Sequence, residues 1–160
     1  MKSHPHLTVY GGDEKIPGVT RVLKEHEEFQ VGTLKIKALH TPCHTTESVS
    51  YLVDGAGSGP DVVFTGDTLF TAGCGRFFEG TPAQMSRNMG VFAGLKPDTL
   101  VYPGHEYTVA NLQFAHSVEL NNSAVTDKLK WSQGKRAAGH PTVPSSIAEE
   151  KSFNPFMRTQ

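Results

Sequence analysis

The chain has 160 residues, enough for one domain with a core of its own. Its 15 basic and 16 acidic residues leave a net charge of −1, so the composition argues against nucleic-acid and anionic-membrane partners. No apolar run has membrane-spanning length, no secretory leader or transit peptide is visible, and two cysteines make no disulfide framework. We therefore expect a cytoplasmic protein that recognises its ligand locally.

The N-terminal third is predicted to be β-structure. Residues 7–10 (LTVY) form a short strand closed by two glycines, and residues 18–29 mix charged and apolar side chains as loop or edge structure does. Residues 31–39 alternate apolar and lysine side chains, which predicts a half-buried strand with its lysines in solvent. That strand runs directly into His40 and His44.

A carboxylate follows the next pair of strands. After a strand predicted at residues 49–54, residues 62–65 are apolar or β-branched and run into a Gly-Asp pair that ends at Asp67. The glycine-rich loop after it contains Arg76, and we expect the backbone of this loop to approach a ligand closely. Taken alone, an Asp in this position caps a turn or helix about as often as it serves a site.

A further strand is predicted at residues 99–103, and the Pro-Gly turn after it carries His105. Three strands therefore end in turns that bear His44, Asp67 and His105. One histidine of this kind is usually structural, but three such turns favour a metal centre. Imidazole nitrogens and a carboxylate suit zinc, and strand ends hold them rigidly.

Helices are predicted mainly in the second half of the chain. A capping box at Thr81 opens the first helix, and a second is expected over about residues 108–119. Asn122 is expected to cap a third helix, and another capping box begins at Ser146. Predicted strands followed by predicted helices are typical of an α/β (α+β) fold.

Two other groups of side chains could supply metal ligands. His4 and His6 form an H-x-H pair, but a strand begins at once after it, and we interpret the pair as a solvated tail. Cys43 and Cys74 neighbour the site elements, but no CxxC motif accompanies them, and we interpret them as structural filling rather than thiolate ligands.

Five segments together resemble one known family: TPCHT, FTGDTLF, AGCGRFFEGT, YPGHEYT and PTVPSSIAEEKSFNPFMR. They look like glyoxalase II, the hydroxyacylglutathione hydrolase family of the metallo-β-lactamase superfamily, over nearly the whole chain. The resemblance implies the C-terminal part of an αββα sandwich, with a mixed sheet followed by helices. It further implies a single, incomplete domain over residues 1–160, in which residues 108–160 are a helical glyoxalase II-type C-terminal segment.

The resemblance also implies roles for individual residues. His44, Asp67 and His105 match metal ligands, with the aspartate bridging two metals in the family. Arg76 and Phe78 match the basic and aromatic pair that holds glutathione, although the family usually has Tyr in place of Phe78. The last match is Tyr107, as another substrate contact.

The activity implied is metal-dependent hydrolysis of a glutathione thioester, S-lactoylglutathione, to D-lactate and glutathione in methylglyoxal detoxification. The cofactor implied is zinc, in a binuclear centre that can also hold Fe or Mn. The family's upstream T-H-x-H-x-D-H motif has no counterpart in this sequence. We therefore expect one metal at most, very slow hydrolysis by the isolated chain, and an exposed sheet face open to self-association or to a complementing chain.

Two alternatives stay open. One is a truncated, non-catalytic glyoxalase II-like protein that binds one metal or a partner chain. The other is the related persulfide dioxygenase with mononuclear iron, which the FFEGT and NPFMR segments disfavour. The family also has a mitochondrial form, but the absence of a transit peptide favours the cytoplasm.

Overall fold

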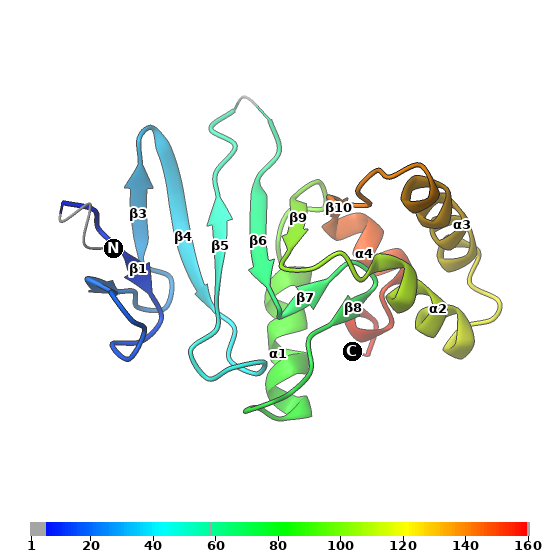
Figure 1. The fold of residues 1–160 in the computed structure, drawn as a ribbon, viewed down its shortest axis with the longest axis horizontal. Coiled ribbons are helices and arrows are strands. Elements are labelled where there is room, and N and C mark those ends of the chain that lie inside the picture. Colours follow the sequence, from blue (N-terminus) through cyan, green and yellow to red (C-terminus); the bar gives the residue numbers. More distant parts are fainter. Residues whose placement is uncertain (1–5, 58, 160) are drawn as a thin grey trace.

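The computed structural model describes residues 6–57 and 59–159, and a six-stranded mixed sheet lies at its centre (Figure 1). The strand order is β10-β9-β6-β5-β4-β3, with β6 and β9 parallel and the other neighbours antiparallel. These strands are β3 (Glu28–Val31), β4 (Leu34–His40), β5 (Val49–Val53), β6 (Val62–Gly66), β9 (Leu100–Pro103) and β10 (Ser145–Ser146).

Smaller elements flank this sheet. Two short pairs of strands are β1 (Tyr10–Gly11) with β2 (Arg21–Val22), and β7 (Leu69–Phe70) with β8 (Gly73–Cys74). The helices are α1 (Pro82–Ala93), α2 (Thr108–Val118), α3 (Ser123–Ala137), α4 (Ile147–Phe153) and the 3-10 turn η1 (Pro155–Met157). Figure 1 shows α2, α3 and α4 gathered beyond the β9 side of the sheet. The predicted fold class, a mixed sheet with helices, is confirmed.

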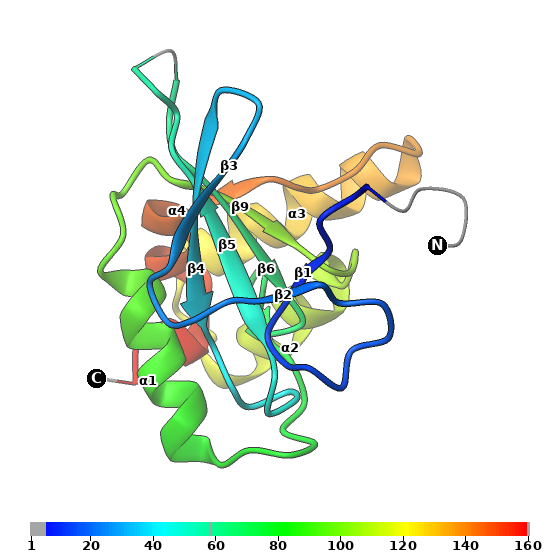
Figure 2. The same cartoon turned by 90° about the vertical axis from the view of Figure 1, so that its left-hand side faces the viewer.

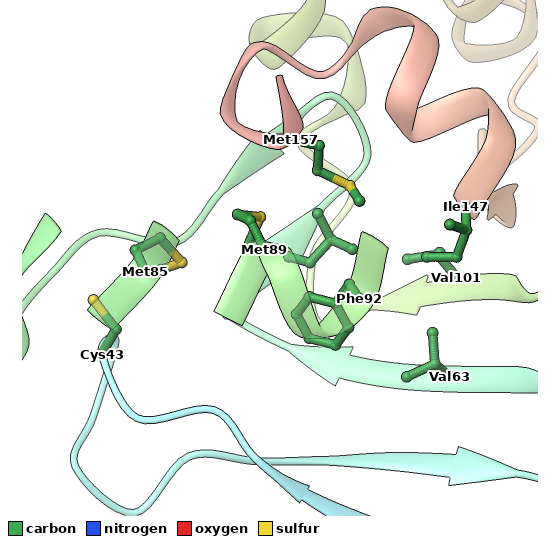
Figure 3. Close-up of a cluster of buried hydrophobic side chains, with 9 residues drawn as sticks. Cys43, Val63, Met85, Met89, Phe92, Val101, Ile147 and Met157 are labelled. Atoms are coloured by element: carbon green, nitrogen blue, oxygen red, sulfur yellow. The ribbon is translucent and has the colours of Figure 1, made fainter. Parts of the chain in front are cut away.

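Helix α1 covers one face of the sheet (Figure 2). It starts where the sequence predicts, because the Thr81 side chain accepts from the N–H of Gln84 and the Gln84 side chain accepts from the N–H of Thr81. Its Phe92 is fully buried and converges with Val63 and Val101 of the sheet (Figure 3). Burial of such side chains supplies most of the free energy that holds the layers together.

The opposite face carries a row of aromatic side chains. Strand pairing places Tyr51, Phe64 and Tyr102 next to one another across β5, β6 and β9. The rings of Phe64 and Tyr102 lie 5.5 Å apart, and Phe64 is 46% exposed. The N-terminal segment lies beside the β3–β4 end of the sheet (Figure 2). There the Tyr10 ring stacks on the ring of Phe29 in β3, with the ring centres 4.1 Å apart.

The sheet topology gathers three loop ends at one edge. Because β5 is antiparallel to both β4 and β6, and β9 is parallel to β6, the strands β4, β6 and β9 all run in the same direction. Their C-terminal ends therefore lie at the same edge of the sheet. These are the ends that lead to His44, Asp67 and His105.

Two strand predictions were wrong in extent. The strand predicted at residues 7–10 is reduced to Tyr10–Gly11, because its partner β2 offers only two residues for pairing. The strand predicted at 31–39 is a hairpin, since Gly32 adopts a φ of +60° and turns the chain between β3 and β4. The His4 prediction lies outside the described residues, and His6 is exposed.

The helix predictions were closer. All four predicted helices are present, and Asn122 and Ser146 cap α3 and α4 as expected. In the described part of the chain, no helix has both the length and the apolar character needed to cross a membrane.

Candidate metal centre

The three predicted ligands meet around one carboxylate oxygen. The Nε2 atom of His44 lies 3.3 Å from Oδ2 of Asp67, and the Nε2 atom of His105 lies 3.4 Å from the same oxygen. The three side chains are 21%, 28% and 50% exposed for His44, Asp67 and His105, so the cluster opens to solvent on the His105 side. The fold thus brings together residues from three separate strand ends.

The protonation of His44 is fixed by its other nitrogen. Its Nδ1 lies 2.9 Å from the carbonyl oxygen of Arg76. A carbonyl oxygen only accepts hydrogen bonds, so Nδ1 carries the proton and donates it. In the neutral ring, Nε2 then presents a lone pair to the Asp67 carboxylate. This lone pair and the carboxylate oxygen could ligate one metal ion together.

The distances fit a shared metal ion. Zinc bonds of about 2.0–2.1 Å at tetrahedral angles place two donor atoms about 3.3–3.4 Å apart. The separations from Asp67 Oδ2 to the two imidazole nitrogens have this value. Among the described residues, however, no three His, Cys, Asp or Glu side chains are already grouped as a complete metal site. The ligands therefore meet in pairs through Asp67, and a metal would draw the two histidines into one set.

Two glycines make room for Asp67. A Cβ atom at Gly75 would lie 1.7 Å from the Asp67 carbonyl oxygen, and one at Gly104 would lie 2.4 Å from Asp67 Oδ1. Neither position has space for a side chain. From the sequence we expect the glycines of this loop to let its backbone approach a ligand. At Gly75 the structure shows a close approach to the backbone of the chain's own Asp67. Gly75 makes room for the Asp67 backbone, and Gly104 makes room for its carboxylate.

The predicted substrate contacts lie on both sides of the cluster. The guanidinium of Arg76 sits 5.3 Å from the ring centre of Phe78, whose edge faces the His44 ring at 5.0 Å. On the other side, Tyr107 stacks on His105 at 4.9 Å. Phe78 is 63% exposed and Tyr107 49% exposed. These side chains can contact a ligand without moving the three central residues.

Comparison with known proteins settles the family. Residues 2–105 match the family model of the metallo-β-lactamase superfamily. The chain belongs to this superfamily. Residues 106–160 match a second model, the hydroxyacylglutathione hydrolase C-terminus. Membership of the metallo-β-lactamase superfamily implies a metal-binding fold, and the resemblance inferred from the sequence motifs is confirmed.

Curated relatives carry the same family name. The chain is 49% identical over 157 residues to the cytoplasmic hydroxyacylglutathione hydrolase of Arabidopsis thaliana, covering 96% of this chain and 61% of the relative. It is 47% identical to the hydroxyacylglutathione hydrolase of Dictyostelium discoideum, covering 95% of this chain and 59% of that protein. The chain therefore spans about three fifths of the length of these relatives.

Solved structures of other proteins share the fold of this chain. The crystal structure of ETHE1 from Myxococcus xanthus matches with a TM-score of 0.66 and 30% identity, over 96% of this chain and 53% of that chain. A metallo-β-lactamase from Staphylococcus aureus matches with a TM-score of 0.63 and 23% identity, over 92% of this chain and 37% of that one. The second likeness concerns the fold alone.

The cysteines are poor candidates for metal ligands. Burial is the main cause and the neighbouring Cys43 the second cause that raise the pKa of the Cys74 thiol to about 12. Burial also raises the pKa of the Cys43 thiol. Both groups therefore stay protonated at neutral pH, whereas a metal binds the thiolate. The two cysteines are free, and the Sγ of Cys43 donates to the Thr81 carbonyl oxygen, as structural filling would.

Sequence reasoning missed three residues around the site. The ring of Phe70 faces those of His105 and Tyr107 at 6.1 and 5.3 Å. Glu150 and Asn154 are fully buried behind the loop that follows Asp67. One signal was available: Glu150 lies three residues after Ile147 and three before Phe153, which places a carboxylate on the apolar face of a helix.

Proposed function

We propose that this chain takes part in metal-dependent hydrolysis of a glutathione thioester, with S-lactoylglutathione cleaved to D-lactate and glutathione. The observation that carries the proposal is the convergence of His44 and His105 on Oδ2 of Asp67. The relatives named hydroxyacylglutathione hydrolase, which are 45–49% identical to this chain, support the reaction class. The name of the Arabidopsis relative supports a cytoplasmic location.

His44, Asp67 and His105 would hold the metal, which we propose to be zinc, because two imidazole nitrogens and a carboxylate are typical zinc ligands. The chemistry that such an ion supplies is Lewis acidity, which polarises a carbonyl and makes water more acidic. The chain contributes the orientation of the ligands. The carbonyl oxygen of Arg76 holds the proton of His44 on Nδ1 and leaves Nε2 free to ligate.

Arg76, Phe78 and Tyr107 would hold the glutathione part of the substrate. Glutathione carries two carboxylates, and a guanidinium binds a carboxylate through paired, charge-assisted hydrogen bonds. Arg76 is exposed and leans over Phe78, while Tyr107 lies on the opposite side of the cluster. A thioester bound between these walls would place its carbonyl near Asp67, where the reaction needs it.

The test is a hydrolysis assay with the purified chain loaded with zinc. We expect thioester loss that depends on added metal and disappears in Asp67→Asn, a variant of nearly the same shape. Arg76→Ala should keep the metal but have a higher KM for the thioester. Zinc binding without any hydrolysis above the Asp67→Asn background would favour the alternative, a non-catalytic protein that binds one metal or a partner chain.

We also propose that the aromatic face of the sheet, made by Tyr51, Phe64 and Tyr102, packs against a second copy of this chain. Phe64 lies between the two tyrosines and is 46% exposed, so a second copy packed on this face would remove an aromatic ring from water. Light scattering over a range of concentrations should show self-association, and Phe64→Ser should reduce it. A strictly monomeric wild-type chain would contradict self-association and leave a different, complementing chain as the occupant.

A further inference from the structure

The hairpin β7–β8 connects the two parts of the proposed site. Asp67 precedes β7, and Arg76 follows β8. The N–H of Gly75 donates to the Thr68 carbonyl oxygen at 3.2 Å, which closes the base of the hairpin. The conformation of this hairpin therefore sets the position of the Asp67 carboxylate relative to the Arg76 carbonyl oxygen that orients His44.

The turn of the hairpin is buried and has an unusual backbone. Ala72 is fully buried and adopts a φ of +59°, a left-handed conformation that is unfavourable for a residue with a Cβ. Such a turn persists only when its surroundings fix it. Its backbone groups are also shielded from water, so each needs a partner within the protein.

Asn111 of α2 donates to the Thr71 carbonyl oxygen at 3.0 Å, and two side chains from the C-terminal segment supply three further partners. The N–H of Ala72 donates to Oε2 of Glu150 at 2.9 Å. The Nδ2 of Asn154 donates to the carbonyl oxygens of Phe70 and Gly73 at 3.3 and 3.1 Å. It also lies 2.9 Å from Oε2 of Glu150, so the two side chains hold one another as well as the turn.

Burial of the Glu150 carboxyl group costs desolvation free energy that an apolar side chain in the same place would not. The Ser145 hydroxyl donates to its other oxygen, so the carboxylate accepts from three donors in all: Ala72, Asn154 and Ser145. A fully buried carboxyl still loses its hydration, and replacement of buried charged groups by apolar ones is often neutral or stabilising. What an apolar residue cannot do is accept from the Ala72 N–H. The arrangement favours fixed geometry over maximal stability.

We infer that Glu150 and Asn154 are positioning residues for the proposed metal and thioester site. They hold the β7–β8 turn in the conformation that presents Asp67 and the Arg76 carbonyl oxygen to His44. Neither residue touches the ligands or the substrate walls. The inference rests on the proposed function, because the role concerns the proposed metal and thioester site. The hydrogen bonds that it invokes can be tested without any reaction.

The experiment compares Glu150→Ala, Glu150→Gln and Asn154→Ala with Leu23→Val, a change at a buried side chain outside the two core clusters that contain Leu69, Ala72 and Cys74 of the hairpin. In Glu150→Gln the amide oxygen can still accept from Ala72, and the amide N–H can donate to the Ser145 hydroxyl. Three quantities are measured at a temperature where circular dichroism shows every variant to be folded. They are hydrogen exchange at the Ala72 and Gly75 amides, zinc affinity, and the KM and kcat for the thioester.

We expect Glu150→Ala and Asn154→Ala to speed exchange at Ala72 and Gly75 and to weaken zinc binding by about 10- to 100-fold, the range for partners behind metal ligands. Glu150→Gln should restore most of both, and Leu23→Val should change neither. Ser145→Ala, which removes only one donor, gives a milder version of the same change if the larger variants do not fold.

Equal effects of Glu150→Ala and Leu23→Val on zinc affinity would overturn the inference, as would unchanged exchange at Ala72. A wild-type chain that binds zinc in the expected pattern but hydrolyses no thioester would overturn the proposed function and leave the positioning role supported. If the wild-type chain binds no zinc, the proposed function fails, and the exchange pattern alone decides the positioning role.

Discussion

The proposed site has a buried support and an exposed rim, and the two differ in what they do. The support consists of Gly75, Glu150 and Asn154. The rim consists of Arg76, Phe78 and Tyr107. Gly75 packs against the Asp67 backbone, and the other two residues bind the hairpin that follows Asp67, whereas the rim faces solvent. From this difference we propose that buried residues remote from the ligand set the geometry of the site, and that the exposed side chains select what is bound.

Removal of a central ligand should have the largest effect. His44→Ala, Asp67→Ala and His105→Ala should each abolish most of the zinc binding, because three ligands leave none to spare. Equilibrium dialysis with zinc measures this. His6→Ala, at an exposed position, and His4→Ala serve as controls and should change little. Equal losses in the two groups would return the metal to the H-x-H pair.

A change in the support should lower stability as well as binding. Gly75→Ala would place a Cβ 1.7 Å from the Asp67 carbonyl oxygen, and we expect the free energy of unfolding to fall by about 3 kcal/mol or more. Urea unfolding measures it. The matched control is Gly134→Ala within α3, where nothing lies within 4 Å of the new Cβ. It should stabilise by about 0.5–1 kcal/mol, and equal losses would contradict the steric explanation.

The support should also respond to pH through Glu150. Burial raises the pKa of this carboxyl from 4.5 to about 7 in the folded chain, against the opposing hydrogen bonds from Ser145, Asn154 and Ala72. Between these two values the folded state binds more protons than the unfolded state, so Glu150 lowers stability as pH rises from about 4.5 to about 7. The change amounts to roughly 3 kcal/mol.

Glu150→Gln removes this titration and keeps the shape of the side chain. The difference in unfolding free energy, Glu150→Gln minus wild type, should therefore increase by this amount as the pH rises from 4.5 to 7. Urea titrations of both proteins across this interval measure the difference. A constant difference across the interval would show that Glu150 does not titrate there.

A change in the rim should alter binding and leave the fold intact. Arg76→Ala should weaken affinity for a glutathione thioester analogue by about 1.5–3 kcal/mol, the usual value for a hydrogen bond to a charged group. Zinc content and the unfolding midpoint should stay the same. Isothermal titration with the analogue measures the first, and loss of zinc would instead assign Arg76 to the support.

The smallest effect is expected at Phe78, which stands where the resembled family usually has Tyr. Phe78→Tyr adds one hydroxyl to an exposed ring and should improve affinity for the analogue by about 0.5–1.5 kcal/mol. Stability should change by less than about 0.5 kcal/mol. No gain in affinity would mean that this ring does not reach the ligand.

Sequence reasoning proposed the ligands and the rim but gave no role to the support. Asp67 and His105 follow apolar strands with Gly or Pro turns, and the motif resemblance added Arg76, Phe78 and Tyr107. All of these signals are local in the chain. The assignment of the ligands and of the substrate contacts stays a prediction until metal and substrate are measured, as does the division of residues 1–160 with a helical segment over 108–160.

The support depends on contacts between distant parts of the chain. Glu150 and Ala72 are 78 residues apart, and nothing near either residue in the sequence indicates that they meet. The β7–β8 hairpin was expected only as a glycine-rich loop, because each of its strands has two residues. The turn at Gly32 was missed because Val31 was joined to the alternating run that begins at Leu34, although the spacing of three between them breaks the period of two.

Anomalous diffraction at the zinc edge, from crystals of the zinc-loaded chain, tests the central claim most directly. The account predicts an anomalous peak about 2.0–2.2 Å from His44 Nε2, Asp67 Oδ2 and His105 Nε2, with the Nδ1 of His44 still on the Arg76 carbonyl oxygen. A peak at His4 and His6 or at a cysteine, with these three side chains bare, would contradict it.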